Sequence, residues 1–200
     1  MLLISGWHAT LLARDGDVLS GIPRQLSKLP KDATHLFISI GGNNALGYMI
    51  HLHDSVKNLG EALISLHKIK SKFQKDYIEM LKHVMALKLP TTTCTIYNPN
   101  YPDTSQQQMC TTGLSVLNDV IVTESTKLGI PVIDLKTIFN NEADYANAIE
   151  PDMPGGDKIT DNMILVVEKH DFSLPWSTIY AKIKEYDDSE EHTTGCFCTH

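Results

Sequence analysis

The sequence predicts an α/β fold, a three-layer α/β/α sandwich built on a parallel, flavodoxin-like sheet. Short apolar runs alternate along the chain with longer amphipathic ones, which is the pattern of βαβ units. The run at residues 35–40 is almost continuously apolar, as expected for a strand that is buried on both faces of a parallel sheet. Helices that connect such strands cover both faces of the sheet through right-handed crossovers.

Local patterns place each element. Apolar and β-branched side chains cluster where strands are expected, at residues 9–13, 35–40, 93–98 and 130–134. Apolar positions recur at helical spacing where helices are expected, at residues 22–29, 52–84 (one helix or two in succession), 114–128 and 157–170. Pro23 suits the first turn of the first helix, and Gly129 lies where a glycine would end the third. We expect loops at residues 106–108 and 140–149, and a short segment remains at 179–183.

Length and charge limit the classes of protein. The 200 residues fit one domain, expected at residues 1–186, followed by a polar and acidic tail at 187–200 with the composition of a disordered segment. Lys and Arg number 17 against 24 Asp and Glu, a net charge of −7. This balance argues against nucleic-acid or anionic-membrane partners, which need clustered positive charge. No apolar run approaches the roughly 18 residues of a membrane span.

Cysteine usage indicates a reducing compartment. There are four cysteines, and Cys94 lies in a strand-like run where a buried free thiol is expected. The tail pair Cys196 and Cys198 has two histidines nearby, but a Cys-x-Cys pair lacks the usual gap of a structural zinc site, so we expect a solvated tail and no metal. No secretory signal is visible at residues 1–8. We therefore expect a cytoplasmic protein without a metal or cofactor.

The strand ends indicate where a ligand would bind. Parallel sheets bind ligands at the carboxyl ends of their strands, which directs attention to residues 14–17, 41–44 and 98–101. The Gly-Gly-Asn-Asn run at 41–44 offers glycine backbone and a carboxamide that could donate hydrogen bonds to an oxyanion. The alternative is a strand-to-helix turn with an asparagine as N-cap. The glycine patterns of nucleotide-binding loops are absent.

Four blocks in this order resemble those of the SGNH (GDSL-type) hydrolases, over about residues 6–170. They are Ala13-Arg14-Asp15-Gly16 and residues 38–44, 96–101 and 149–159. The resemblance implies hydrolysis of a small ester or acyl substrate by a serine nucleophile. It also implies an oxyanion hole that includes Gly16 and Asn43. Asn44 stands where the family usually carries Asp, and we expect the consequence to be structural.

The family's nucleophile is missing. No Gly-Asp-Ser motif occurs, and the eight residues before the strand expected at 9–13 cannot form a strand and a crossover helix. We therefore expect the first strand to be absent and the chain to be an N-terminally incomplete version of the family. Ser5, Ser20 and Ser39 lack a supporting motif, and Ser39 is expected to pack within its strand.

The catalytic base is missing as well. Where the family commonly has Asp-x-x-His, Asp152 is followed by Gly155, and His170 falls at the far end of the last helix. Glu150 and Asp152 remain as carboxylate candidates, with a solvated loop as the plainer interpretation. The sequence thus predicts an SGNH-like ester or acyl hydrolase whose activity is impaired. The alternative is a non-catalytic binding or interaction protein that reuses the fold. Its oligomeric state is left open.

Overall fold

Four parallel strands form the central sheet of the computed structural model, which describes residues 6–183. In spatial order they are β1 (Leu36–Ile38), β2 (Thr91–Cys94), β3 (Val132–Ile133) and β4 (Ile179–Tyr180). The register pairs Phe37 with Thr92 and Cys94 with Ile133, and β4 extends the sheet by pairing Ile133 with Tyr180. The predicted α/β class with a parallel sheet is confirmed.

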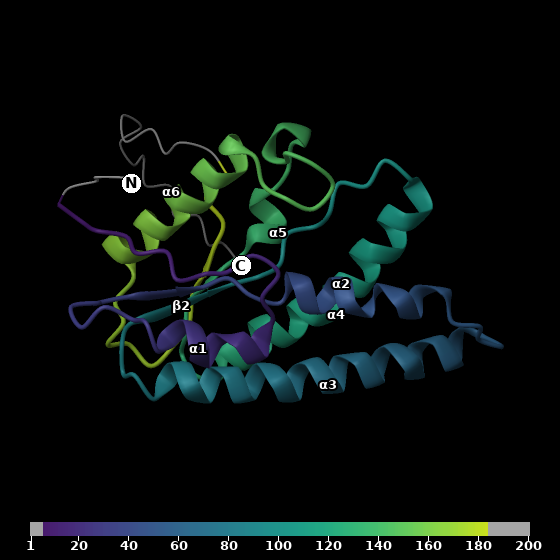
Figure 1. The fold of residues 1–200 in the computed structure, drawn as a ribbon, viewed down its shortest axis with the longest axis horizontal. Helices are drawn as coiled ribbons and strands as arrows, with labels where there is room; N and C mark the ends of the chain where they lie inside the picture. The colour runs from purple at the N-terminus through teal and green to yellow at the C-terminus, as the bar shows by residue number, and fades with distance from the viewer. Residues whose placement is uncertain (1–5, 184–200) are drawn as a thin grey trace, which may run out of the picture.

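Helices cover both faces of the sheet (Figure 1). One layer holds α1 (Ile22–Leu26), α3 (Leu59–Met85) and α4 (Thr104–Thr126), and the other holds α5 (Leu135–Ile138) and α6 (Met153–Lys169). Successive side chains of β1 point to opposite faces of the sheet and so pack in both helix layers. Leu36 and Ile38 pack with α3 and α4, while Phe37 packs on the α6 side. Shorter elements complete the connections: η1 (Leu19–Gly21), α2 (Gly42–Tyr48), η2 (Met49–His53) and η3 (Glu142–Asp144).

A buried polar contact joins β2 to the helix layer that contains α3 and α4. The Ser125 hydroxyl of α4 accepts a hydrogen bond from Thr93 of β2 at 2.8 Å and lies 3.3 Å from the Tyr77 hydroxyl of α3. Burial raises the pKa of Tyr77 to about 12. On the other face of β2, Cys94 is a buried free thiol, as predicted, and burial raises its pKa to about 12.

Residues 9–13 do not form the strand expected there. They run as an extended segment without strand pairing, and Leu11 is 87% exposed. A strand needs a neighbour to satisfy its backbone and a layer to cover its apolar side chains, and the described part of the chain supplies neither at this segment. Within residues 6–183, β1 is therefore the edge strand of the sheet.

Helix boundaries differ from expectation where caps decide them. Residues 106–108 belong to α4 and not to a loop, because the Asp103 side chain accepts a hydrogen bond from the Gln106 N–H at 2.7 Å and starts the helix. Likewise α6 begins at Met153, where Asp152 is the N-cap and Pro154 lies in the first turn. Gly129, with φ +71°, follows α4 as predicted.

The crossovers do not share one hand. The chain crosses the sheet in a single direction from β1 to β4, yet α3 and α4 lie on one face and α6 on the other (Figure 1). The β3–β4 crossover therefore has the opposite hand to the first two, so the expectation of uniformly right-handed crossovers is wrong. The tail at 187–200, with its Cys and His residues, lies outside the described residues. None of the helices within 6–183 combines the length and apolarity that a membrane crossing needs.

Candidate functional site

A cavity of about 880 Å³ opens at the carboxyl ends of β1 and β2, beside α2, η2, α3 and α4. The loops after the strands give it mainly polar and charged walls: Arg14, Asp15, Asp17, Ser39, Asn43, Thr95 and Glu150. The helices give it mainly apolar walls: Leu46, Met49, Leu52, Ala62, Leu66, Ile69, Met109, Leu114 and Leu117. The cavity thus lies at the sheet edge that the sequence indicated, and its walls are amphipathic.

Asn43 joins two of the predicted blocks. Its side-chain Nδ2 donates a hydrogen bond to the Asp17 carbonyl oxygen at 3.0 Å, so the Gly-Gly-Asn-Asn run contacts the turn that contains Gly16. Gly16 has φ +72° and is exposed next to the cavity-lining residues Asp15 and Asp17, although it is not itself part of the wall. The structure therefore brings Gly16 and Asn43 to one end of the cavity.

Asn44 joins the Gly-Gly-Asn-Asn run to η1. Its Oδ1 accepts a hydrogen bond from the Leu19 N–H at 3.1 Å, which fixes the start of η1 to α2. An aspartate at this position could accept the same bond, so this contact does not require an asparagine. Neither asparagine is the N-cap of α2; that position belongs to Gly41, with φ +119°, and no side chain caps it. A Cβ there would lie 3.1 Å from the side chains of Phe73 and Ile96, so the position is also tightly packed.

Asp17 is held in place beside Asn43. Its carboxylate accepts hydrogen bonds from Gln25 at 2.8 Å and Arg24 at 3.0 Å. The bond from Gln25, opposed by desolvation and helped by Arg24, lowers the pKa of Asp17. An ionised Asp17 therefore fixes the segment 14–17 against α1, while its backbone carbonyl accepts the hydrogen bond from Asn43.

The two candidate carboxylates occupy different places. Glu150 lines the cavity and accepts a hydrogen bond from the Asn147 side chain at 2.5 Å. Asp152 is not part of the wall, because its carboxylate bonds the Met153 N–H at 2.8 Å at the start of α6. Both are exposed.

A buried ion pair holds the loop that carries both candidate carboxylates. Asp144, 1% exposed, bonds the Lys158 ammonium at 2.7 Å and the backbone N–H groups of Asn140 and Asn141 at 3.0 Å. Because the Asp152 N–H also donates to the Asp144 carbonyl at 2.8 Å, the buried aspartate positions the whole turn.

The serines of the wall lack a histidine partner. Ser39 and Ser65 line the cavity, and neither is hydrogen-bonded to a histidine within residues 6–183. Ser39 is exposed, so the expectation that it packs within a strand is wrong: β1 ends one residue earlier. A serine–histidine contact does occur between Ser71 and His67 (3.3 Å), but both are exposed on α3 and outside the wall.

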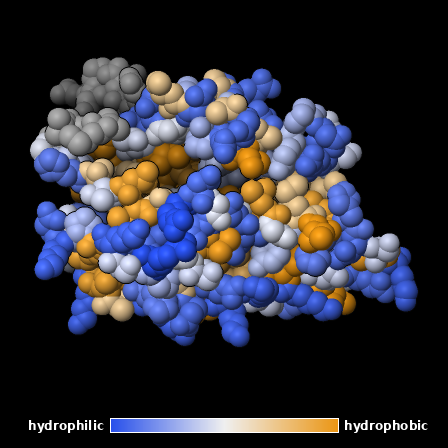
Figure 2. Space-filling model, viewed as in Figure 1, coloured by the Kyte–Doolittle hydropathy of each residue, from blue (hydrophilic) through white to orange (hydrophobic). Residues whose placement is uncertain are grey.

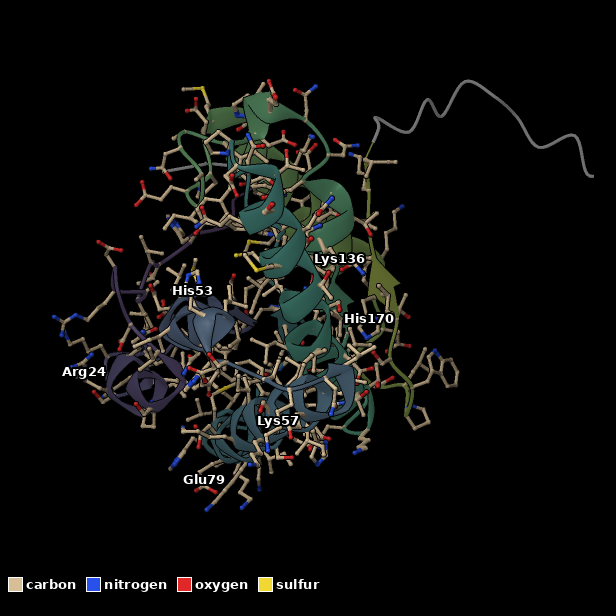
Figure 3. The ribbon with its side chains drawn as sticks, turned by 90° about the vertical axis from the view of Figure 1, so that its right-hand side faces the viewer. Arg24, His53, Lys57, Glu79, Lys136 and His170 are labelled. Carbon is tan, nitrogen blue, oxygen red and sulfur yellow. The ribbon has the colours of Figure 1, made fainter. Side chains whose placement is uncertain are left out.

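Sequence reasoning missed His51. It lines the cavity from η2, and its Nδ1 lies 2.9 Å from the Asp54 carboxylate, which also lines the wall. The signal was the His-x-x-Asp spacing, which on one helical turn brings the two side chains together. Figure 3 labels the next histidine of η2, His53, and shows His170 far from it on the β4 side. His170 contacts the Tyr180 hydroxyl at 3.0 Å and does not line the cavity, as its position in the sequence predicted.

The charges of the wall are mostly negative. Asp15, Asp17, Asp54 and Glu150 line it, against Arg14 as its one arginine or lysine among the described residues. Desolvation, with a smaller effect of the Glu150 charge, raises the pKa of Tyr97 at the same end. Within 6–183 no group of three His, Cys, Asp or Glu side chains is arranged to hold a metal.

These features define an α/β protein with a cavity at the carboxyl ends of the strands of a parallel sheet. No protein-family model matches the sequence, and no curated protein matches it. Among solved structures, an extracellular lipase from Streptomyces rimosus is similar to this chain in part of its fold, with a TM-score of 0.46 and 14% sequence identity. The similarity covers 68% of this chain and 64% of the lipase, so the chain spans less than two thirds of that protein's length.

Proposed function

We propose that this protein is SGNH-hydrolase-like and binds a small ester or acyl compound in the cavity, with hydrolysis impaired. The observation that carries the proposal is the contact between Asn43 and Asp17 at the more polar end of the amphipathic cavity. In this arrangement the carbonyl group of the ligand lies beside Asn43, near the turn that contains Gly16. An amide and free backbone N–H groups are the donors that an ester carbonyl needs.

Two features of the wall support impairment. The cavity serines lack a histidine partner in the described residues, and a serine without a positioned base is a weak nucleophile. In addition, the Asn43 amide already donates to a backbone carbonyl, so it must leave that bond or use its second hydrogen to stabilise an oxyanion. Of the two candidate carboxylates, Glu150 is the one that lines the wall, where it could accept a proton.

The second candidate function is binding without turnover. The engaged Asn43 amide favours it, because such an amide can orient a bound carbonyl without stabilising a developing charge. The two candidates share the cavity and differ in turnover alone.

Ligand binding and turnover are measured separately to test this. The probes are p-nitrophenyl acetate for hydrolysis, a fluorophosphonate for serine labelling, and 4-nitroacetanilide, the amide counterpart of the ester, for calorimetric binding. We expect saturable binding of the anilide, weakened about fivefold by Asn43→Ala through loss of one hydrogen bond and unchanged by Lys68→Ala on exposed α3. Turnover is expected to be weak but above the level of heat-unfolded protein, and turnover at that level would favour the second candidate.

Two results would contradict the proposal. Fluorophosphonate labelling together with turnover that the label abolishes would show a competent serine hydrolase. Absence of anilide binding would remove the ester site itself.

A further inference from the structure

One face of α3 changes its role along the helix. Phe73, Tyr77 and Val84 are fully buried in the core. One to three turns earlier, Ala62, Leu66 and Ile69 continue a similar face, but they are half-buried and line the cavity. Apolar side chains from α2, η2 and α4 surround the same space: Leu46, Leu52, Met109, Leu114 and Leu117. The helices thus leave apolar surface inside the molecule that the described chain does not fill.

The geometry points to a single unbranched acyl chain as the occupant of this helix-lined part, with its carbonyl group beside Asn43. The assignment rests on the proposed function and names its class of ligand. A volume of about 880 Å³ is in the range of pockets that enclose most of a small molecule. A carbonyl compound with an apolar chain has the same polarity, end to end, as the walls.

The wall charges select a neutral head group. Against Arg14 stand four carboxylates, of which Asp17 pairs with Arg24 and Asp54 contacts His51. Asp15 and Glu150 remain beside the polar end without an ion pair in the described residues. A free fatty-acid carboxylate is repelled there, whereas an ester or amide carbonyl is not.

Exposed apolar side chains lie around one end of the cavity, at η2 and the start of α3. Ile50 of η2 is 74% exposed, and Leu59 and Leu63 in the first turns of α3 are 74% and 56% exposed. Figure 2 shows apolar surface at this end, over η2 and the start of α3. Their neighbours Leu52 and Leu66 line the cavity, so apolar surface runs from solvent into the interior. A poorly soluble chain can therefore follow apolar surface into the cavity, past the His51–Asp54 pair at η2.

Gly113 offers a direct test of the space. It lies in α4 and lines the cavity, and a Cβ built on it meets no atom within 4 Å. Gly156 of α6 is a matched control, since it too is helical with open space at its Cβ, but it lies outside the cavity wall. Leucine at either position replaces glycine in a helix, which favours folding.

The experiment measures calorimetric dissociation constants for 4-nitroacetanilide, 4-nitrooctananilide and 4-nitrododecananilide. We expect affinity to rise along the series by up to about fourfold for each added methylene, the value for full transfer out of water. Gly113→Leu is expected to weaken the dodecananilide by about tenfold or more while leaving 4-nitroacetanilide unchanged, because it removes volume that the chain needs. Gly156→Leu is expected to change neither, and dodecanoate is expected to bind more weakly than the dodecananilide.

The outcomes separate this inference from the proposed function. Binding of 4-nitroacetanilide without a gain along the series, or a gain that Gly113→Leu leaves intact, overturns the acyl-chain site and keeps the ester site. Failure of all three anilides to bind overturns both. Should Gly113→Leu unfold, as judged by circular dichroism, Ser65→Trp replaces it, because Ser65 is an exposed residue of α3 that lines the same cavity. Lys68→Trp is its control, since Lys68 is exposed on α3 and does not line the cavity.

Discussion

The side chain of Asn118 supplies the hydrogen bonds that Ile96 would otherwise receive from a neighbouring strand. Asn118 Oδ1 accepts from the Ile96 N–H and its Nδ2 donates to the Ile96 carbonyl, both at 2.8 Å, and Asn118 is 4% exposed. The N–H groups of Thr93 and Thr95 donate toward β3, so Ile96 faces the side of β1, which has already ended. This contact lets the chain leave the sheet and form the cavity wall at Ile96.

Asn118→Leu is expected to lower the free energy of unfolding by about 2–4 kcal/mol, because it leaves two buried backbone groups unpaired. Urea denaturation followed by circular dichroism measures the change. Ser115→Ala, on the exposed side of α4, is the control and should stay within about 0.5 kcal/mol of the unaltered protein. A loss no larger than that of the control would show that water replaces the asparagine.

Gly155→Ala is expected to destabilise the protein by about 1–3 kcal/mol through overpacking. A Cβ at Gly155 would lie 2.4 Å from the Asp144 carbonyl oxygen and 2.9 Å from the Phe139 ring. Gly156→Ala, one residue further along α6, meets no atom and should be neutral or stabilising by up to about 1 kcal/mol. Thermal unfolding of both variants provides the comparison, and equal midpoints would contradict the close packing of α6 against η3.

Protonation of His170 is expected to oppose folding. Burial lowers its pKa from the ordinary value of 6.5, against a smaller opposing effect of Asp171. The unfolded chain therefore binds more protons than the folded one between the lowered pKa and 6.5, so stability falls as pH decreases through this window. Urea midpoints measured on both sides of pH 6.5 test this against His170→Gln, which should show a shallower pH dependence. Parallel slopes for the two proteins would rule out His170 as the source.

The thiols of Cys94 and Cys110 are expected to differ in reactivity. Burial raises the pKa of Cys94 to about 12 and leaves it 1% exposed, whereas Cys110 is half-buried on the cavity wall. Brief iodoacetamide treatment of the folded protein, followed by peptide mass spectrometry, should modify Cys110 and spare Cys94. Treatment in urea should modify both. Modification of Cys94 without denaturant would show that the layer of α6 opens readily.

The sequence was a good guide wherever burial on two faces or helical periodicity decided the structure. The strand near residues 35–40 and the helix that ends at Met85 follow from their apolar patterns. Prediction from the sequence failed where the structure depends on a pairing strand or on a helix cap. Residues 9–13 have strand-like side chains but lack a pairing neighbour, and Asp103 starts α4 well before the apolar periodicity becomes visible.

The site was predictable in its polar half alone. Gly-Gly-Asn-Asn after a buried strand located Asn43 at the cavity, because strand ends and tight turns are local features. The apolar part of the cavity wall depends on how far α3 extends beyond the sheet. A periodic apolar helix face has the same sequence pattern whether it packs against the core or lines a cavity. Leu66 and Phe73 illustrate this, since they share one pattern and differ in what lies opposite them.

The opposite hand of the last crossover has a consequence for how the molecule opens. Strand twist favours right-handed connections, so β4 joins the sheet against the usual preference and contributes just two residues. Its hold on β3 depends on the N–H groups of Val132 and Asp134, which donate to Thr178 and Tyr180. Hydrogen exchange should therefore be faster at these two amides than at Thr93 and Thr95 in the middle of the sheet. The hydrogen bonds between β3 and β4 would then open locally while those between the other strands stay formed.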